Sequence, residues 1–468
     1  MIRKQHTGSI FLILLIITYV SQLNAQEIPN EFFQFQSQKL FLDSGKDWET
    51  HTTFGPIRYN HSSILRNFHD SLSIQSRFGL YTHKKDIALY GYGHFSYKGN
   101  FYGYLYPRIV NDPDAFPRYT GQPRDISRGG FNSGETDLAG LGFQSDWLMF
   151  QLGRGRQSWG AGNDIQLVLS ENSPAYDYGL LGLDFGKLRV RYFHGYLESD
   201  SISVNRYITG RGVEWANQKN LVIGLSELVI YSGKNRPFDL AYLNPISTHL
   251  EIELNDRQNK LGTSSGNGVW QTSIDWLAKP NLRVSGNFLF DEFVIDKVEK
   301  DEGKEHGSAQ SFKVVFTPSH LSSGLLSFFF AWIRVGSPTF RHGDGNNNFV
   351  QRGQPLGWEY GSDGREIKLG FNYFNMKNLV GNLEIGQREI GEESIILRPY
   401  ETYFDYLSGQ FPSGIVNKTS FMSGQVQWWW KSNVSLISGF EWSDSSIEGK
   451  TFDVHIGIDI YYPKSFKL

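Results

Sequence analysis

The residues best suited to bind a ligand lie in a glycine-rich segment near residue 160. Gly153 to Asp164 reads GRGRQSWGAGND and holds two arginines, a tryptophan and an Asn-Asp pair. Guanidinium groups donate paired hydrogen bonds to carboxylates, and an aromatic ring can stack on a pyranose. We therefore expect a polysaccharide-binding site formed by Arg154, Arg156, Trp159, Asn163 and Asp164.

A structural role is the alternative for part of this segment. Arg154 and Arg156 can continue a strand and pair with acidic side chains inside a barrel. The sequence leaves both interpretations of the arginines open. For the glycines Gly155, Gly160 and Gly162 we favour the structural interpretation, a tight loop.

The sequence carries no pattern of a catalytic or metal site. Asp291 and Glu292 are adjacent, so in a strand they would face opposite sides and could not act on one bond. His194, His249 and His455 fall on separate segments without the spacing of metal ligands. No phosphate-binding glycine loop follows a strand. We expect no enzyme activity, no cofactor and no metal.

The start of the chain has the pattern of an exported protein. Arg3 and Lys4 precede an apolar run from Ile10 to Val20, and a polar stretch then ends at Ala25. These are the regions of a secretory signal, and the run is shorter than the roughly 20 residues that a spanning helix needs. We expect residues 1–25 to be a signal peptide.

The composition narrows the class of protein. The chain has no cysteine, which excludes disulfides, thiolate metal sites and a lipoprotein anchor. Losing the signal removes two basic and no acidic residues, so the net charge moves from −3 to −5, unlike that of most nucleic-acid-binding proteins. Aromatic residues reach 15% while the mean hydropathy is only −0.38. A membrane β-barrel reconciles these values, since only alternate residues need be apolar.

Apolar and polar residues alternate along much of the chain, which indicates β-strands. The last such segment is the clearest, with Phe452, Val454, Ile456, Ile458 and Ile460 separated by polar residues or glycine. Most segments are nine to twelve residues long, which suits a tilted membrane crossing. The predicted strands are 72–81, 86–97, 99–110, 136–144, 146–155, 178–184, 187–197, 208–216, 220–231, 266–277, 281–292, 309–317, 324–335, 364–374, 377–388, 420–430, 433–443 and 451–461.

The connections between these strands alternate in length. Every link after an even-numbered strand is short, whereas links such as 111–135, 232–265 and 389–419 are long. Short periplasmic turns and long outer loops are typical of outer-membrane barrels, and a soluble sandwich has no reason to sort its loops in this way. We therefore predict an all-β fold, a transmembrane antiparallel β-barrel of about eighteen strands over residues 72–468. Its lumen should be wet or ion-paired, because charged residues such as Lys368 and Glu384 face inward.

Residues 26–71 precede the first strand and do not alternate. They include an aromatic stretch at 32–35 and a turn at Gly55-Pro56. The segment is too short for the independently folded plug of a nutrient transporter. A periplasmic segment and a plug in the lumen are both open interpretations.

Three segments between about residues 150 and 295 carry a likeness to a known family. They are GRGRQSWGAGND followed by IQLVLSENSP, LNPISTHLEIE followed by Asn255 and Asn259, and LRVSGNFLFDEF. Through them the chain resembles the capsule assembly Wzi family of outer-membrane proteins, and its loops and N-terminus look closest to Bacteroidetes members. The resemblance implies an eighteen-stranded barrel with a helical periplasmic element, although the short, Phe-rich N-terminal segment departs from that pattern.

The resemblance also implies a function. The expected protein is a non-enzymatic, lectin-like component of the cell outer membrane, with its long loops extracellular, that binds capsular or exopolysaccharide and helps attach or assemble it. Its expected partners are that polysaccharide, outer-membrane lipids and the polysaccharide export machinery, with no role for nucleic acid. The alternative, drawn from the charged inner face, is a porin-like channel for sugars or acidic oligosaccharides.

Overall fold

The computed structural model describes most of the chain beyond residue 71. The described residues are 53–54, 72–116, 119–200, 203–259, 265–291, 297–301, 303, 306–318, 324–375, 377–404, 409–431 and 433–467. The predicted signal peptide and nearly all of segment 26–71 lie outside them. No helix in these ranges has the length and apolar content needed to cross a membrane.

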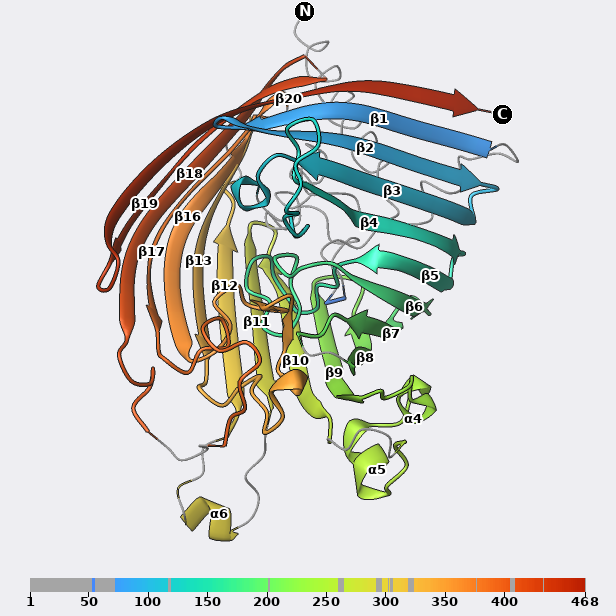
Figure 1. Ribbon diagram of the computed structural model, residues 1–468, viewed down its shortest axis with the longest axis vertical. Helices are drawn as coiled ribbons and strands as arrows, with labels where there is room; N and C mark the ends of the chain where they lie inside the picture. The colour runs from blue at the N-terminus through green and yellow to red at the C-terminus, as the bar shows by residue number, and fades with distance from the viewer. Residues whose placement is uncertain are drawn as a thin grey trace, which may run out of the picture.

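Eighteen antiparallel strands form one closed sheet (Figure 1). Each strand pairs with the strands before and after it, and β1 closes the ring by pairing with β20. The strands of the barrel are β1 (Leu72–His83), β2 (Asp86–Tyr97), β3 (Phe101–Val110), β4 (Ser133–Gln144), β5 (Leu148–Gly155), β6 (Tyr176–Asp184), β7 (Leu188–Leu197), β8 (Val204–Ala216), β9 (Leu221–Lys234), β10 (Asn267–Lys279), β11 (Leu282–Phe290), β12 (Ser308–Phe316), β13 (Leu325–Val335), β16 (Gly364–Phe374), β17 (Leu379–Ile390), β18 (Asn417–Lys431), β19 (Val434–Ser445) and β20 (Gly449–Lys467).

Short elements occupy the long connections. A two-residue hairpin joins β14 (Val350–Gln351) to β15 (Gln354–Pro355) between β13 and β16. The described helices are η1 (Pro113–Ala115), α4 (Leu240–Leu243), α5 (His249–Leu254), α6 (Lys297–Asp301) and η2 (Gly345–Asn347).

The predicted fold class and number of strands are confirmed. β16 has the predicted bounds, and most other strand ends differ from the prediction by a few residues. The largest difference is at the C-terminus, where β20 continues beyond the predicted end at residue 461. It does so because it pairs with β1 from Tyr81↔Asp459 as far as Ser73↔Lys467, which completes the backbone hydrogen bonds of the first strand.

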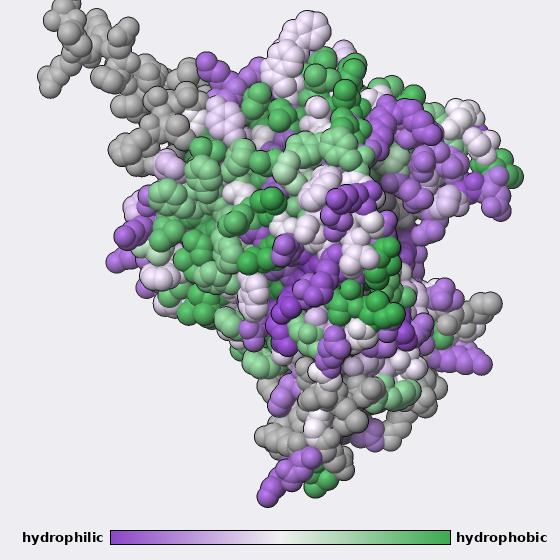
Figure 2. Space-filling model, turned by 90° about the vertical axis from the view of Figure 1, so that its left-hand side faces the viewer, coloured by the Kyte–Doolittle hydropathy of each residue, from purple (hydrophilic) through white to green (hydrophobic). Residues whose placement is uncertain are grey.

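The outer wall of the barrel is apolar. Outward-facing residues of β20 from Phe452 to Ile460 are 41–68% exposed, and the space-filling view shows broad hydrophobic patches on the side of the molecule where β16–β20 lie (Figure 2). This row spans roughly 20 Å across a membrane if the strands tilt by about 40°. Trp215, Trp276 and Trp428 are exposed next to the short turns, where a membrane boundary favours aromatic rings.

Three long loops fold inward and form a dry cluster in the lumen, which we call the loop core. It joins residues of 156–175, 336–363 and 391–416 to inward-facing residues of the wall such as Phe193 and Ile333. Main-chain bonds connect two of the loops, from Ser170 N to Leu356 O at 2.8 Å and from Trp358 N to Leu167 O at 3.1 Å. The predicted wet or ion-paired lumen is therefore wrong for this region, because Ile165, Leu167, Val168 and Leu169 belong to a loop that packs inside the barrel.

Two described residues of segment 26–71 also lie in the lumen. The ring of Phe54 is 4.9 Å from that of Trp159, and Thr53 donates a hydrogen bond of 2.9 Å to Glu214 of β8 through its hydroxyl. Glycine is needed opposite them, since a Cβ at Gly212 would collide with Phe54 and one at Gly224 with Thr53. The two interpretations of segment 26–71 stay predictions, because its other residues lie outside the described ranges.

The connection between β9 and β10 instead covers the outside of the wall. We call residues 236–259, which include α4 and α5, the outer flap; Figure 1 shows both helices beside β9. Tyr242 of the flap stacks on Tyr231 of β9 with ring centroids 4.4 Å apart. Tyr231 is on the outward face of β9, because it alternates in step with Leu225, which is exposed to the outside.

An ion pair is enclosed beneath the outer flap. Arg211 of β8 and Glu227 of β9 approach to 3.4 Å, and both side chains are less than one tenth exposed. Glu227 also accepts a hydrogen bond of 2.9 Å from the His249 N–H, so it ties α5 to the wall. A close approach makes this possible, since a Cβ at Gly268 would lie 2.5 Å from the His249 ring.

Replacing Glu227 with alanine should loosen the outer flap. Arg211 would remain buried without its acid, and losing one partner of such a pair costs about 3–5 kcal/mol. Hydrogen exchange should become faster across residues 236–259 while the strands remain protected. The matched control is Glu251→Ala, which breaks the exposed pair with Arg257 and should cost about 1 kcal/mol or less. Equal protection in Glu227→Ala and the unmodified protein would contradict this account.

The outer flap should also open as the pH falls. Burial, followed by the charge of Arg211, lowers the pKa of His249 from 6.5 to about 4. Glu253 is 3.5 Å from His249 Nε2, but burial raises the pKa of that carboxyl, which weakens it as a counter-charge. The groups around His249 are Arg211, Glu227, Tyr242, Glu253 and His342.

The direction of this pH effect on flap closure follows from proton uptake by His249. Between pH 6.5 and about 4, His249 takes up a proton when the flap is open but not when it is closed. The free energy of flap closure therefore becomes less favourable by up to about 3 kcal/mol as the pH falls through that window. Exchange of residues 236–259, corrected for intrinsic rates, should show reduced protection at pH 4.5 relative to pH 7. His249→Gln should remove most of that difference. Protection independent of pH in the unmodified protein would refute the effect.

Candidate functional site

A cavity of about 450 Å³ lies between the loop core and the opposite side of the lumen. Its wall comes from both ends of the chain, from β1–β3 and from β16–β20, which are neighbours only because β20 pairs with β1. Segment 163–172 and residues 357–359 form its remaining side. We call it the lumen cavity.

Tyrosines line the lumen cavity on the side of β1–β3. Tyr81, Tyr90 and Tyr106 all belong to its lining, and the rings of Tyr90 and Tyr106 lie 5.8 Å apart at 56°. The Tyr90 hydroxyl donates a hydrogen bond of 2.7 Å to Asp459. Such side chains offer an apolar ring face together with a polar group.

Charged side chains line the opposite side and are paired with one another. Lys368 of β16 is 3.4 Å from Glu366 and 3.8 Å from Glu384 of β17. Glu359 projects into the lumen cavity from a loop, and the surrounding protein raises the pKa of its carboxyl by desolvation. The amides of Asn382 and Gln425 add further hydrogen-bonding groups. Together these groups can donate to and accept from a polyhydroxylated ligand.

The predicted binding residues separate into three places. Asn163 and Asp164 line the lumen cavity. Asp164 is 51% exposed at its side chain and lies 3.9 Å from Lys313, which also donates a hydrogen bond of 3.0 Å to the Asn163 carbonyl. Trp159 is fully buried in the loop core, and its ring centroid is 5.2 Å from that of Phe193. Its ring faces are covered by protein, which gives this side chain the position of a packing residue.

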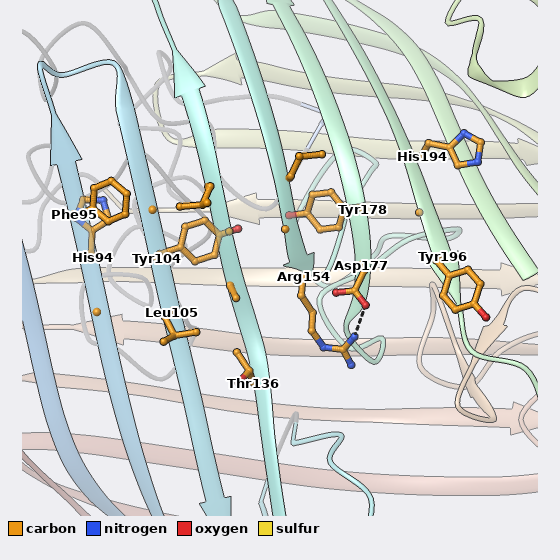
Figure 3. Close-up of a pocket in the computed structure, with 18 of the residues that line it drawn as sticks. His94, Phe95, Tyr104, Leu105, Thr136, Arg154, Asp177, Tyr178, His194 and Tyr196 are labelled. Atoms are coloured by element: carbon orange, nitrogen blue, oxygen red, sulfur yellow. Dashed lines mark hydrogen bonds and ion pairs between the residues drawn. The ribbon is translucent and has the colours of Figure 1, made fainter. Parts of the chain in front are cut away.

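Arg154 lies in an ion-pair cluster at the end of β5. It contacts Asp177 at 3.1 Å, Glu135 at 3.2 Å and Glu198 at 3.7 Å. Figure 3 shows Arg154 and Asp177 facing each other from neighbouring strands. Arg352 joins this cluster, 2.7 Å from Glu198 and 3.0 Å from Glu135.

The pKa values of the cluster agree with strong pairing. Burial alone would lower the pKa of Arg352, but its bonds to Glu198 and Glu135 outweigh burial and raise it. Burial alone would likewise raise the pKa of Glu198, and Arg352 with Arg154 lowers it. Three carboxylates thus engage Arg154, while its part in ligand binding stays a prediction.

Arg156 is also engaged by the protein. Its Nε donates a hydrogen bond of 2.7 Å to the Ser173 carbonyl, and its guanidinium lies 3.9 Å from Asp137. Arg156 therefore connects the two ends of the loop that forms one side of the lumen cavity.

A second and larger hollow follows the wall over β1–β8, with a volume of about 1280 Å³. It includes Arg154, Asp177 and Tyr196, labelled in Figure 3. Most of its lining is apolar, and Leu105 and Leu152 within it are exposed on the outward face. Such a surface suits acyl chains better than sugar hydroxyls, so we do not place the glycan there.

Asn287 of β11 holds the loop that carries Asn163 and Asp164. Its side-chain oxygen Oδ1 accepts a hydrogen bond of 2.6 Å from the Ala161 N–H. Its side-chain amide donates to the main-chain carbonyls of Ala161 at 3.0 Å and Ile165 at 3.3 Å. Gly160 is required beside it, because its φ of +136° is rarely adopted by other residues.

Within the described ranges no group of three or more His, Cys, Asp or Glu residues is arranged to hold a metal ion.

Sequence reasoning missed the tyrosines of the lumen cavity. Alternation placed Lys368 and Glu384 on the inner face, and that position is confirmed. Alternation alone does not show that strands at opposite ends of the chain share a cavity with loop 163–172. Pairing the first predicted strand with the last would have brought Tyr81 and Asp459 together.

Comparisons with known proteins support the fold. No protein-family model and no curated protein matches the chain. Among solved structures it is similar to Wzi of Escherichia coli, an outer-membrane protein involved in group 1 capsule assembly and described as a carbohydrate-binding β-barrel. The TM-score is 0.57 at 12% identity, and 84% of this chain and 85% of that chain are covered.

Two structures from Pseudomonas aeruginosa are more distant. OprD gives a TM-score of 0.45 at 10% identity, covering 85% of this chain and 94% of its own. OpdK, solved with vanillate, gives 0.45 at 9% identity and covers 85% and 98%. The similarity to Wzi shows the fold, a closed antiparallel barrel.

Removing the Asn287 anchor should release the loop from the wall. Asn287→Leu would leave the buried Ala161 N–H and carbonyl without their partner, at about 1–3 kcal/mol for each unsatisfied group. In planar lipid bilayers this variant should conduct more often than the unmodified barrel. Asn372→Leu, which changes a cavity residue and not the anchor, is the control. Identical conductance in all three proteins would count against a loop that seals the lumen.

Proposed function

We propose that this protein is a non-enzymatic barrel of the cell outer membrane that binds capsular or exopolysaccharide and helps attach it to the cell surface. The observation that carries the proposal is the lumen cavity, where tyrosine rings, amides and paired charges surround a space of about 450 Å³. Hydroxyl-rich ligands match such a mixture, since each hydroxyl both donates and accepts hydrogen bonds. A few polar groups placed inside a concave pocket are typical of ligand sites.

The orientation and family are part of the same proposal. Barrels of this type keep short turns in the periplasm, so we place the long loops and the outer flap on the extracellular side. We also infer a distant membership of the Wzi family. The segments GRGRQSWGAGND and LRVSGNFLFDEF support it, and in this fold they meet through Asn287. The similarity to the carbohydrate-binding Wzi barrel agrees with this inference.

Within the predicted residues we assign different roles. Asn163 and Asp164 contact the glycan, because they line the lumen cavity. Arg154, Arg156 and Trp159 position the loop that carries them, through ion pairs, a main-chain hydrogen bond and packing in the loop core.

The porin-like alternative is less well supported. The charged side chains of the lumen cavity favour it, since they could guide acidic oligosaccharides. The loop core opposes it, because buried apolar side chains from three loops occupy the lumen beside the cavity. Long-lived open channels in bilayers containing the unmodified barrel would favour the channel over the binding protein.

Asp164→Ala should weaken glycan binding. Hydrogen bonds to a charged group contribute about 1.5–3 kcal/mol, so the dissociation constant should rise roughly 10- to 100-fold. The probe is polysaccharide extracted from the surface of the source bacterium, measured by calorimetry with the purified barrel.

The matched control is Asp453→Ala. Asp453 is also 51% exposed and also pairs with a lysine, Lys84, but it lies outside the lumen cavity. The proposal requires strong binding by the unmodified protein and by this control. It fails if the extracted polysaccharide does not bind, and the site assignment fails if the two aspartate variants bind equally well.

A further inference from the structure

The outward faces of β8 and β9 carry a charged pair that is buried. From the short turn upwards, β9 presents Ile223 and Leu225, which are exposed, and then Glu227, which is 1% exposed under the outer flap. Arg211 occupies the same row on β8, paired with Glu227 across the strands. This part of the wall is therefore polar and covered by protein.

The covered part lies at the height of the apolar band. Across β10, Trp270 pairs with Glu227 on one side and with Phe290 of β11 on the other. Phe290 is 43% exposed on the outer face, and its neighbour Phe288 is 46% exposed. On β20 the exposed apolar row starts near the short-turn end at Ile460 and extends over eight residues to Phe452. On β9, Glu227 lies only six residues beyond Leu221, which is at the same end of the barrel, so it falls within the height of that row. A charged pair thus occurs where neighbouring strands present phenylalanine.

The outer flap supplies the apolar surface that the wall lacks there. Its inward side chains, Tyr242, His249 and Ile252, are buried against the wall. Its opposite side exposes large apolar residues, with Ile246 at 85% and Leu254 at 83%. The exposed apolar residues of the flap are Phe238, Leu240, Leu243, Ile246, Leu250 and Leu254. Large apolar side chains that are exposed together on a protein surface mark contact with a partner or a membrane.

We propose that the outer flap is embedded in the membrane leaflet on the long-loop side, with these residues in contact with lipid acyl chains. The flap replaces the missing apolar wall and separates the Arg211–Glu227 pair from lipid. Continuity supports acyl chains as the occupant, since Leu225 and Phe290 border the flap on the same outward face. The exposed pair of Glu251 and Arg257 suits the headgroup region, where charged side chains remain hydrated.

This arrangement gives the flap a physical role. A charged side chain that faces lipid costs up to about 2–4 kcal/mol in a barrel wall, with the cost falling toward the interfaces, so an uncovered Arg211 would disfavour insertion. Short amphipathic elements of this kind lie at an interface with their apolar face in the acyl region. The membrane therefore helps hold the flap closed, and the flap lets the wall keep its polar contacts.

Site-directed spin labelling can test the depth of the flap directly, because the chain has no native cysteine. Three single-cysteine variants are labelled with a nitroxide and reconstituted in vesicles of phosphatidylethanolamine and phosphatidylglycerol. They are Leu254→Cys on the flap, Ile456→Cys on the bare wall and Val298→Cys on α6. Val298 is the aqueous control because α6 extends beyond the ends of the strands (Figure 1).

The accessibility of the label to oxygen and to a water-soluble nickel chelate gives the result. The Leu254 label should match the Ile456 label, with high oxygen and low nickel accessibility. Nickel accessibility equal to that of the Val298 label would overturn the proposal. Protection from both reagents together with a dimeric mass would also overturn it, in favour of a second copy of this chain as the occupant.

A second variant separates lipid contact from folding. Leu250→Glu with Leu254→Glu alters only exposed side chains, so the barrel should keep its heat-modifiable mobility on gels. A label at Ile246→Cys in that background should gain nickel accessibility relative to the same label alone. Unchanged accessibility with an intact barrel would show that acyl chains do not hold the flap. Neither measurement depends on glycan binding.

Discussion

Closure of the sheet between β1 and β20 is the constraint on which the rest of the molecule depends. Inside a bilayer every backbone N–H and carbonyl must find a partner within the protein, and a sheet meets this condition only when its two edges pair. The pairing extends from Tyr81↔Asp459 to Ser73↔Lys467 and accounts for the length of the last strand. It also decides which residues share the lumen, since strands from opposite ends of the chain become neighbours.

In the lumen and on the outer wall, a long connection covers strand residues that do not suit their surroundings. On the inside, apolar loops replace water in part of the lumen and pack against inward-facing residues such as Phe193. On the outside, a polar stretch of wall around Arg211 is covered by the outer flap. In both places a long connection supplies the surface that the strands do not. Alternation gives each strand one inward and one outward face, and at these two places a loop covers the residues that do not suit their surroundings.

The sequence was sufficient for the barrel because its signals are local and repeated. Period-two alternation and the parity of loop lengths predicted eighteen strands, and β16 was placed at its observed bounds. Loop positions have no such signal. The mostly apolar segment 165–169 looks the same whether it crosses a membrane or packs in a lumen, and nothing local assigns Trp159 to packing. The tyrosines at 81, 90 and 106 were missed because the lumen cavity is a product of long-range closure and not of any one segment.

The position of the lumen cavity has a consequence for biogenesis. Asn163 and Asp164 lie on a loop between β5 and β6, yet most of the surrounding wall comes from β1–β3 and β16–β20. A barrel that grows strand by strand would therefore hold segment 163–172 before it holds the complete lumen cavity. The lumen cavity becomes complete only when the last strand pairs with the first, so any ligand bound there would report on the finished barrel.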